Sequence, residues 1–409
     1  MPGMRRGPTR REFLGTGAIA GAGLALGWPA THLIAQPVAP ADGLAFFVIS
    51  DTHMLADSKS PGMIDGARWA LNERLVGVLN TLPGQPLPAA IGGGRVAQPR
   101  AVLHLGDIAD SGDKLGAAHE QMTATEWAAH TRLYGLTGTE GPLRYPMYEV
   151  HGNHDTPRAA NVVLQGLIAR NARRRGLTAI SSNGLHYSWD WDGIHFVALG
   201  IVVGANLDDL PISRYGSYDS LAFLVEDLHT HVAGSGRPVI VLQHVDLQRY
   251  SVACDDAVKG GSRAICCEGM AKIAWHSKDC PKHADGISMS EWSACDVRAY
   301  HRALAPYNVA AIFHGHLHAR RTDVWDGLAV GASQGIPVFG AKNAGAGGVN
   351  RAFFYCRIEG AELVVREYQS SGEEGWSRDR SEIRWEPRLW RVPLQRTAAM
   401  AQARAGIVG

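Results

Sequence analysis

The chain has 409 residues, 45% of them hydrophobic and 19% charged, and its 40 basic and 39 acidic residues leave a formal net charge of +1. This balance excludes an overall basic field aimed at nucleic acid. The length is enough for one large core or for one domain with insertions. After the first 41 residues, no apolar run approaches the length of a membrane span.

The first 41 residues predict an export signal. Arg10 and Arg11 form a twin-arginine pair, and a Gly- and Ala-rich apolar stretch follows over residues 15–28. A basic start, a short apolar stretch and a small-residue cleavage site are typical of a processed signal. Cleavage after Ala35 and after Ala41 both fit, and an uncleaved membrane anchor is the alternative. We expect the twin-arginine translocase as a partner during export, a periplasmic or secreted mature protein, and no stable membrane span in it.

Five short apolar runs predict buried strands, because runs of this length are typical of strands covered on both faces. They cover residues 44–50, 101–105, 146–150, 238–243 and 309–313. Each is followed by a polar cluster: Asp51-Thr52-His53, Gly106-Asp107, Gly152-Asn153-His154-Asp155, His244 and Gly315-His316-Leu317-His318. Ligands of open α/β sheets bind beyond the carboxyl ends of the strands. The five clusters are therefore expected to converge on one site.

The clusters predict a site for two divalent cations. A mixed set of imidazole, carboxylate and amide donors favours borderline transition metals such as Mn, Fe or Zn. Two adjacent cations repel each other unless an anionic ligand lies between them, and Asp107, alone beside a glycine, is the natural bridge. Each of the 18 histidines taken alone has a simpler interpretation, as a surface or core residue. His104, in particular, is interpreted either as a core residue or as a support for the site.

Helices and hairpins are expected between the five strands. The periodicity of apolar residues predicts helices over residues 66–82, 120–134, 158–175 and 220–232. Turn residues predict three hairpins, which pair 187–191 with 194–199, 321–325 with 328–331, and 351–358 with 362–368. The arginines of 158–175 fit either contacts with an anionic substrate or solvated charges at a helix end.

The ordered set D-x-H, G-D, G-N-H-D, H and G-H-x-H resembles the calcineurin-like metallophosphoesterase superfamily over roughly residues 44–369. The resemblance implies an α/β (α+β) fold, a four-layer α/β/β/α sandwich of two mixed sheets with the metal site at the carboxyl ends of the strands. It implies that Asp51, His53 and His318 hold the first metal. It implies that Asn153, His244 and His316 hold the second, with Asp107 bridging. His154 would then face the substrate and protonate the leaving oxygen, while Asp155 steadies its ring.

The implied activity is hydrolysis of a phosphoric ester, in which metal-bound hydroxide attacks phosphorus and His154 acts as general acid. Asp110 stands where purple acid phosphatases carry tyrosine, and the run 106–112 lacks the arginine of protein Ser/Thr phosphatases. A second domain like that of exported nucleotidases does not fit into residues 371–409. A phosphodiesterase acting on small-molecule phosphate esters is therefore favoured. A small-molecule phosphomonoesterase and a non-catalytic metal-binding scaffold are the alternatives.

Three segments are expected: the signal at 1–41, a catalytic domain at 42–369, and a tail at 370–409 of unassigned role. The domain carries an insertion at about 246–295 that is expected to form one wall of the substrate pocket. Its cysteines are Cys254, Cys266, Cys267, Cys280 and Cys295. Disulfides are the first interpretation for an exported chain. Buried thiols and a structural zinc site are the alternatives.

Overall fold

The computed structural model describes residues 43–156, 161–205, 215–247, 294–327, 329–346, 348–377 and 383–395. The export signal lies outside these residues, and so do Cys254, Cys266, Cys267 and Cys280 of the insertion, whose disulfide, thiol and zinc interpretations stay predictions. In the part of the chain that is described, no helix combines the length and the apolar character needed to cross a bilayer.

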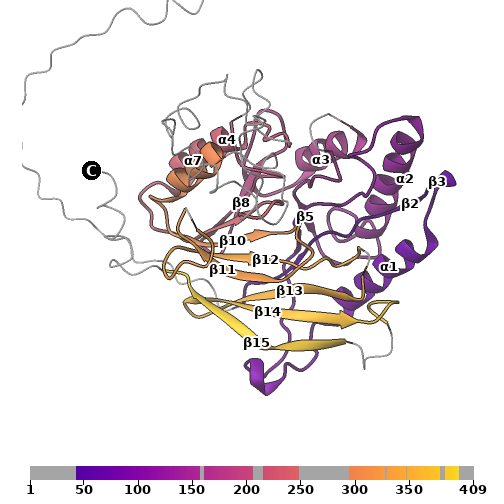
Figure 1. Ribbon diagram of the computed structural model, residues 1–409. Coiled ribbons are helices and arrows are strands. Elements are labelled where there is room, and N and C mark those ends of the chain that lie inside the picture. Colours follow the sequence, from indigo (N-terminus) through magenta and orange to yellow (C-terminus); the bar gives the residue numbers. More distant parts are fainter. Residues whose placement is uncertain are drawn as a thin grey trace, which may run out of the picture. The chain divides into compact units, whose positions relative to one another are not determined.

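The first sheet has six strands in the order β15-β14-β13-β1-β4-β5. Figure 1 shows β13, β14 and β15 of this sheet side by side. The bounds of the six strands, in the same order, are Ile383–Pro393, Glu362–Ser371, Asn350–Glu359, Ala45–Ile49, Val102–His104 and Met147–Glu149. Strands β1, β4 and β5 run parallel to one another, whereas β1, β13, β14 and β15 pair antiparallel. The parallel strands therefore end at one common edge of the sheet.

The second sheet has seven strands in the order β11-β12-β10-β9-β8-β7-β6. Their bounds are Arg321–Trp325, Ile336–Gly340, Val309–His314, Val239–Leu242, Ile194–Ala198, Tyr187–Trp191 and Leu177–Ile180. Strands β8, β9, β10 and β12 are parallel neighbours, and antiparallel strands flank them on both sides. A small two-stranded sheet, β2 (Ala56–Asp57) with β3 (Ser60–Ile64), completes the set.

The two large sheets face each other across a core of large apolar side chains. Phe46 of β1 lies 5.6 Å from Phe196 of β8 and 6.5 Å from Phe313 of β10, measured between ring centroids. This burial of one apolar face from each sheet is the main force that holds the sandwich together.

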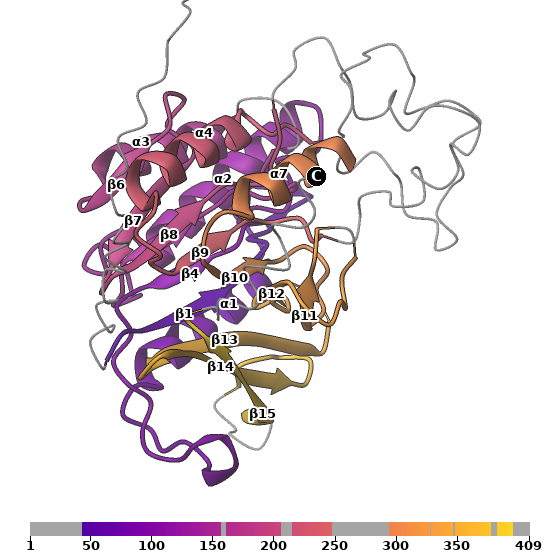
Figure 2. The ribbon, with the colours of Figure 1, turned by 90° about the vertical axis from the view of Figure 1, so that its left-hand side faces the viewer.

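Helices cover the outer faces of both sheets. α1 (Gly66–Thr81) and α2 (Ala117–Tyr134) pack on the first sheet. α4 (Ser220–Asp227), the turn η2 (Leu228–Val232) and α7 (Ala294–Leu304) pack on the second. In Figure 2, α4 and α7 lie on one side of β8, β9 and β10, with β13 to β15 on the other. The expected four-layer α/β/β/α sandwich is confirmed.

The helix expected over residues 158–175 is also present, as α3. α3 (Val162–Arg173) begins at Asn161, whose side chain accepts hydrogen bonds from the N–H groups of Val163 and Leu164. A short helical turn, η1 (Ala89–Ile91), lies in the Pro- and Gly-rich segment after α1. In α3 and just after it, Arg170 and Arg174 bind the buried Glu149. These two arginines therefore serve neither of the expected roles.

Two of the three hairpins are confirmed. Asp192 and Gly193 both adopt positive φ, 48° and 79°, as the tight turn between β7 and β8 requires. The hairpin expected around Gly327 is wrong. Strand β11 pairs with β12, Trp325 opposite Ile336, and Val330 makes only an isolated bridge. Ile336 is fully buried whereas Val330 is partly exposed, so burial selects the later partner.

The domain boundary expected at residue 369 is also too early. Trp376 is 1% exposed and its indole N–H donates to the carbonyl oxygen of Ala344 at 2.7 Å. Strand β15 then pairs with β14, and Leu394 is buried. The segment left without a role is therefore the edge of the first sheet.

Candidate metal centre

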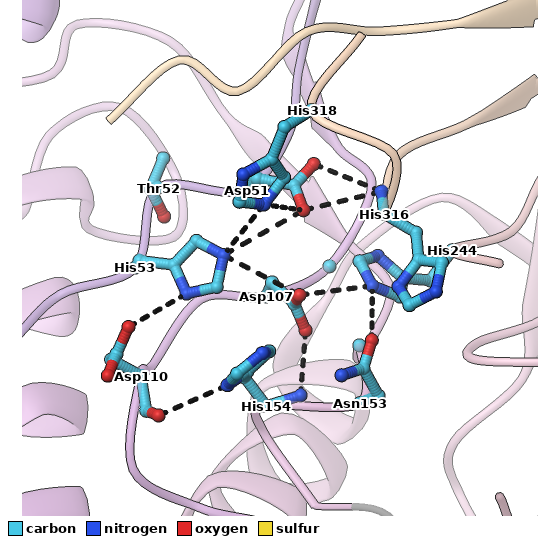
Figure 3. A network of polar contacts seen from close by, with 12 residues as sticks. Asp51, Thr52, His53, Asp107, Asp110, Asn153, His154, His244, His316 and His318 are labelled. Carbon is cyan, nitrogen blue, oxygen red and sulfur yellow. Dashed lines mark hydrogen bonds and ion pairs between the residues drawn. The ribbon is translucent and has the colours of Figure 1, made fainter. Parts of the chain in front are cut away.

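The seven expected metal ligands meet at the carboxyl ends of five strands. Asp51 and His53 follow β1, Asp107 follows β4, Asn153 follows β5, His244 follows β9, and His316 and His318 follow β10. Figure 3 shows them around one centre. The first sheet supplies four of these ligands and the second sheet three.

Asp107 lies between two groups of donors. Its Oδ2 is 3.6 Å from His53 Nε2 and 3.2 Å from His244 Nε2. Asp51, His53, Asp107 and His318 form one group whose ligand atoms all lie within 4.8 Å of one another, and Asp107, His244 and His316 form a second. Asn153 Oδ1 is 3.0 Å from His244 Nε2. The position of Asp107 matches that of a bridging ligand.

The chemistry of this donor set fits divalent cations. Asp51 is fully buried and Asp107 is 1% exposed, and among the described residues their ion-pair partners are all histidines. His53 Nε2 and His318 Nε2 lie 3.2 Å apart, and both nitrogens also face the carboxylate of Asp51. Buried carboxylates without Lys or Arg partners, surrounded by converging imidazoles, are the ligands expected of a borderline dication.

In the absence of cations, the charges of His244 and His318 would balance those of Asp51 and Asp107, because these groups shift one another's pKa values. Burial alone would raise the pKa of Asp51, but the hydrogen bond from His318 and the charge of His244 lower it to about 2. Burial alone would lower the pKa of His244, but Asp107 raises it to about 9. Cation binding would release these protons, because a ligating imidazole is neutral.

Two of the expected histidine ligands have an oxygen atom close to their second ring nitrogen. His244 Nδ1 lies 2.7 Å from the carbonyl oxygen of Leu105, to which it donates, and this leaves Nε2 free for the site. His53 Nδ1 lies 3.2 Å from Asp110 Oδ1. A metal-bound histidine commonly donates its other N–H to such an oxygen, which fixes its tautomer.

The backbone is strained at the ligands. Five of the seven expected ligands have left-handed φ: Asp51 (53°), His53 (42°), Asp107 (54°), His316 (72°) and His318 (51°). Such conformations cost roughly 1–3 kcal/mol each outside glycine and persist only where the surrounding structure enforces them. Strain concentrated at one place in a fold is typical of a functional site.

The motif glycines are needed because the ligand loops touch one another. A Cβ at Gly152 would overlap Asp107 Oδ1, and one at Gly315 would overlap the hydroxyl of Ser50. Any larger residue at either position would push an expected metal ligand, Asp107 or Asp51, away from the centre.

His154 lies at the rim, with its side chain 33% exposed. Its Nδ1 is 3.2 Å from the carbonyl oxygen of Asp110 and 3.5 Å from Asp113 Oδ1. Burial alone would lower the pKa of His154, but Asp113 and Asp107 raise it to about 10. The imidazole is therefore charged at neutral pH in the absence of cations.

Asp155 does not have the contact expected of it. Its carboxylate accepts hydrogen bonds from the backbone N–H groups of Ile108, Ala109 and Gly152, at 2.7 to 2.9 Å. Burial, together with the charge of Asp107, raises the pKa of Asp155 to about 7. Asp155 thus shapes the loop after Asp107, and the contacts to the His154 ring come from Asp110 and Asp113 instead.

Two supporting residues carried little or no signal in the sequence. His104 is buried; its Nδ1 accepts from the N–H of Gly106 at 3.1 Å, so its Nε2–H donates to Thr52 Oγ1 at 2.8 Å. It links the loops of Asp51 and Asp107. Glu126 of α2 accepts from the N–H groups of Ala56, Asp110 and Ser111. The sequence marks Glu126 only as a polar residue in a helix.

Distant likenesses to solved structures span most of the chain. A single mutant of Vps29 from Entamoeba histolytica is 11% identical, over 86% of this chain and 99% of that one, with a TM-score of 0.28. Vps29 from Chaetomium thermophilum is 9% identical, over 87% and 100%, with a TM-score of 0.29. A predicted phosphoesterase from Streptococcus pneumoniae TIGR4 is 11% identical, over 79% and 88%, with a TM-score of 0.26. No curated protein matches the chain.

The model of one protein family matches residues 44–320, about two thirds of the chain and all five ligand clusters. That family is the calcineurin-like phosphoesterases. Together with the candidate groups of metal ligands, the match means that this chain belongs to the calcineurin-like phosphoesterase family and is a hydrolase acting on phosphoric ester bonds.

Proposed function

We propose that the protein is a dinuclear phosphodiesterase that acts on small-molecule phosphate esters. The observation that carries this choice is the acidic rim beside His154. The carboxylate of Asp113 approaches the His154 ring, and that of Asp110 approaches His53. Lys114, the cation of this loop, pairs with Asp110 at 2.9 Å.

The acidic rim favours a substrate of low charge. A phosphodiester carries one negative charge at neutral pH, whereas a phosphomonoester carries about 1.5 to 2. The additional charge of a monoester would lie near Asp110 and Asp113 without a free cation from this loop to offset it. This supports a diesterase over a monoesterase.

The metals would be held as the family resemblance implies. Asp51, His53 and His318 would hold one ion, Asn153, His244 and His316 the other, and Asp107 both. When bound, two such cations lower the pKa of water and neutralise charge on phosphoryl oxygens. We propose Mn, Fe or Zn, since the donor set mixes imidazole with carboxylate and amide oxygen.

We propose His154 as the general acid. Asp113 and the carbonyl oxygen of Asp110 both face Nδ1, so a proton is held there and Nε2 is left for the substrate. A proton donated to the leaving oxygen would make an alkoxide a competent leaving group.

We also propose that the mature chain acts outside the inner membrane, on the basis of the twin-arginine sequence. The translocase would then be a partner during export only, and the mature enzyme would bind its ester substrate.

Steady-state hydrolysis of bis-p-nitrophenyl phosphate and of p-nitrophenyl phosphate tests the proposal, with metal content measured by mass spectrometry on the same samples. We expect two metals per chain and a higher kcat/KM for the diester. Asp113→Asn should raise the relative rate on the monoester. A higher kcat/KM for the monoester in the wild-type protein would assign the site to phosphomonoesters instead.

A further inference from the structure

One side chain connects the loop of His316 and His318 to the far strands of the other sheet. Arg320 lies two residues after His318, just before β11. Its Nη1 is 2.5 Å from Glu386 Oε2 on β15 and 3.5 Å from Glu367 Oε1 on β14. Its guanidinium carbon also lies 5.5 Å from the ring centroid of Trp390, at cation–π distance. Strands β14 and β15 are thus in direct contact with a metal-ligand loop.

A second loop of the site reaches the same carboxylate. Lys342 follows β12, and its Nζ lies 3.9 Å from Glu367 Oε1. The same loop binds the first ligand cluster through its backbone: the N–H of Ala344 donates to the carbonyl oxygen of Ser50, and the N–H of Ala346 to that of Asp51. Glu367 is therefore shared by two loops that hold the first metal position.

The carboxylates of Glu367 and Glu386 face the side chains of Arg320 and Lys342. The charges of this cluster balance one another, so it has no excess negative charge to bind a further ion. The side chain of Glu367 is fully buried and that of Glu386 is 14% exposed. Gln369 donates to both carboxylates. Two carboxylates face two cations, so the cluster is neutral as it stands. Removing one member of such a buried group leaves its partner uncompensated.

The loop that Arg320 follows has particular need of support. His316 and His318 both have left-handed φ, and the His318 side chain is 40% exposed, against 4% for His53. His318 is therefore held least by its own surroundings. A strained, exposed ligand keeps its position only if neighbouring contacts fix the backbone.

We propose that Arg320, Glu367 and Glu386 are positioning residues for the first metal position, and that strand β15 is part of the support of the metal centre. The inference rests on the proposed ligation by Asp51, His53 and His318. It gives a role to the C-terminal segment that lies beyond the residues matched by the family model.

The test compares two isosteric substitutions in similar ion pairs. Glu386→Gln removes the nearer of the two carboxylate charges that Arg320 faces. Glu359→Gln is the matched control, because Glu359 pairs with Arg366 at 2.7 Å, is 24% exposed, and lies on β13. Metal-free protein is titrated with Mn²⁺ by calorimetry, and the electron paramagnetic resonance spectrum separates single Mn²⁺ ions from coupled pairs.

In Glu386→Gln we expect one of two Mn²⁺ affinities to fall by about 10–100-fold, the range typical of supporting contacts at metal sites. The spectrum should shift from coupled pairs to single ions at limiting Mn²⁺. Glu359→Gln should bind as wild type does, at a comparable melting temperature. Arg320→Lys, which keeps the charge, should be intermediate and serves if Glu386→Gln does not fold.

Unchanged Mn²⁺ binding in Glu386→Gln, or in Arg320→Lys where that variant serves, would overturn the inference. So would an equal loss at both positions, which would point to a general effect on the fold. Failure of the proposed dinuclear centre is recognised separately, since wild-type protein would then bind fewer than two Mn²⁺ per chain.

Discussion

Asp107 belongs to two of the groups of candidate metal ligands, so its charge would act on both of the proposed cations. Asp107→Asn preserves size, and asparagine tolerates the left-handed φ of 54° at this position. The fold should survive, but a neutral bridge cannot offset two adjacent dications. We expect a loss of kcat/KM larger than about 10–100-fold, with reduced metal content by mass spectrometry. Two metals and near-normal activity would contradict the dinuclear assignment.

His154 should matter in proportion to the basicity of the leaving group. In His154→Ala, an alkyl ester should lose about 10²–10⁴ in rate, because its alkoxide needs a proton, and a nitrophenyl ester much less. Metal content should stay at the wild-type value, since the ring does not belong to either ligand group that contains Asp107. Equal losses on both esters, or loss of metal, would show that His154 only shapes the loop of Asn153.

The residues that could be predicted are those whose position in the sequence, directly after a strand, already indicates their place in the fold. Polar residues directly after apolar runs marked Asp51, Asp107 and His244 as members of one site. The contact of Asp155 could not be predicted, because it depends on which backbone N–H groups a turn presents. His104 lies within an apolar run, so nothing in the sequence separates a support from a core residue.

An ion cluster centred on the buried His195 joins β7 and β8 to α4. His195 is buried, with Nδ1 2.7 Å from Asp190 Oδ1 and Nε2 2.7 Å from Asp227 Oδ2. Burial alone would lower the pKa of His195, but the two carboxylates raise it above 6.5. A raised pKa means that the stabilisation is complete below about pH 6.5 and is lost as the pH rises through the folded-state value.

The unfolding free energy of wild type and of His195→Gln, measured by urea denaturation between pH 6 and 9, checks this cluster. The wild type should be the more stable protein at pH 6, and the difference should shrink as the pH rises. The comparison cancels other titrating groups, among them the histidines of the metal centre. A difference that is constant over this range would mean that His195 stays in one protonation state.

At the level of elements, local turn chemistry predicted β7 and β8 but not the partner of β11. A tight turn at Asp192-Gly193 makes that pairing a local event. The pairing of β11 with β12 depends on where β12 lies in the sheet, and β12 is held there by its parallel pairing with β10. Pairings of this kind depend on strands that are distant in the sequence, so they cannot be predicted from a short segment of it.

For the whole chain, the twin-arginine pair predicts export. Arg10→Lys with Arg11→Lys should leave the precursor in the cytoplasm, because the translocase reads the paired guanidinium groups. Arg5→Lys with Arg6→Lys is the matched control, since it makes the same chemical change outside the pair. Cell fractionation with immunoblotting measures both. Normal export of the first variant would argue against this route.

The order of the strands in the whole molecule was only partly predictable. The expected layers follow from alternating strands and helices and from the family resemblance. The position of β15 does not, because charged residues interrupt its apolar pattern and residues 372–382 separate it from its partner. Its tryptophans contact residues that are distant in the sequence, as Trp385 shows by packing against Tyr368 of β14 at 4.6 Å between ring centroids.

Because four of the proposed ligands come from one sheet and three from the other, the metals would cross-link the two sheets at the carboxyl ends of their parallel strands. Their removal should loosen the ligand loops while the apolar core between the sheets stays packed. Hydrogen exchange should then accelerate at residues 51–54, 106–110 and 314–319 in chelated protein and stay slow in β1 and β9. Uniform acceleration would mean that the ions stabilise the whole fold. The supply of metal would then determine how well this end of the molecule resists proteases.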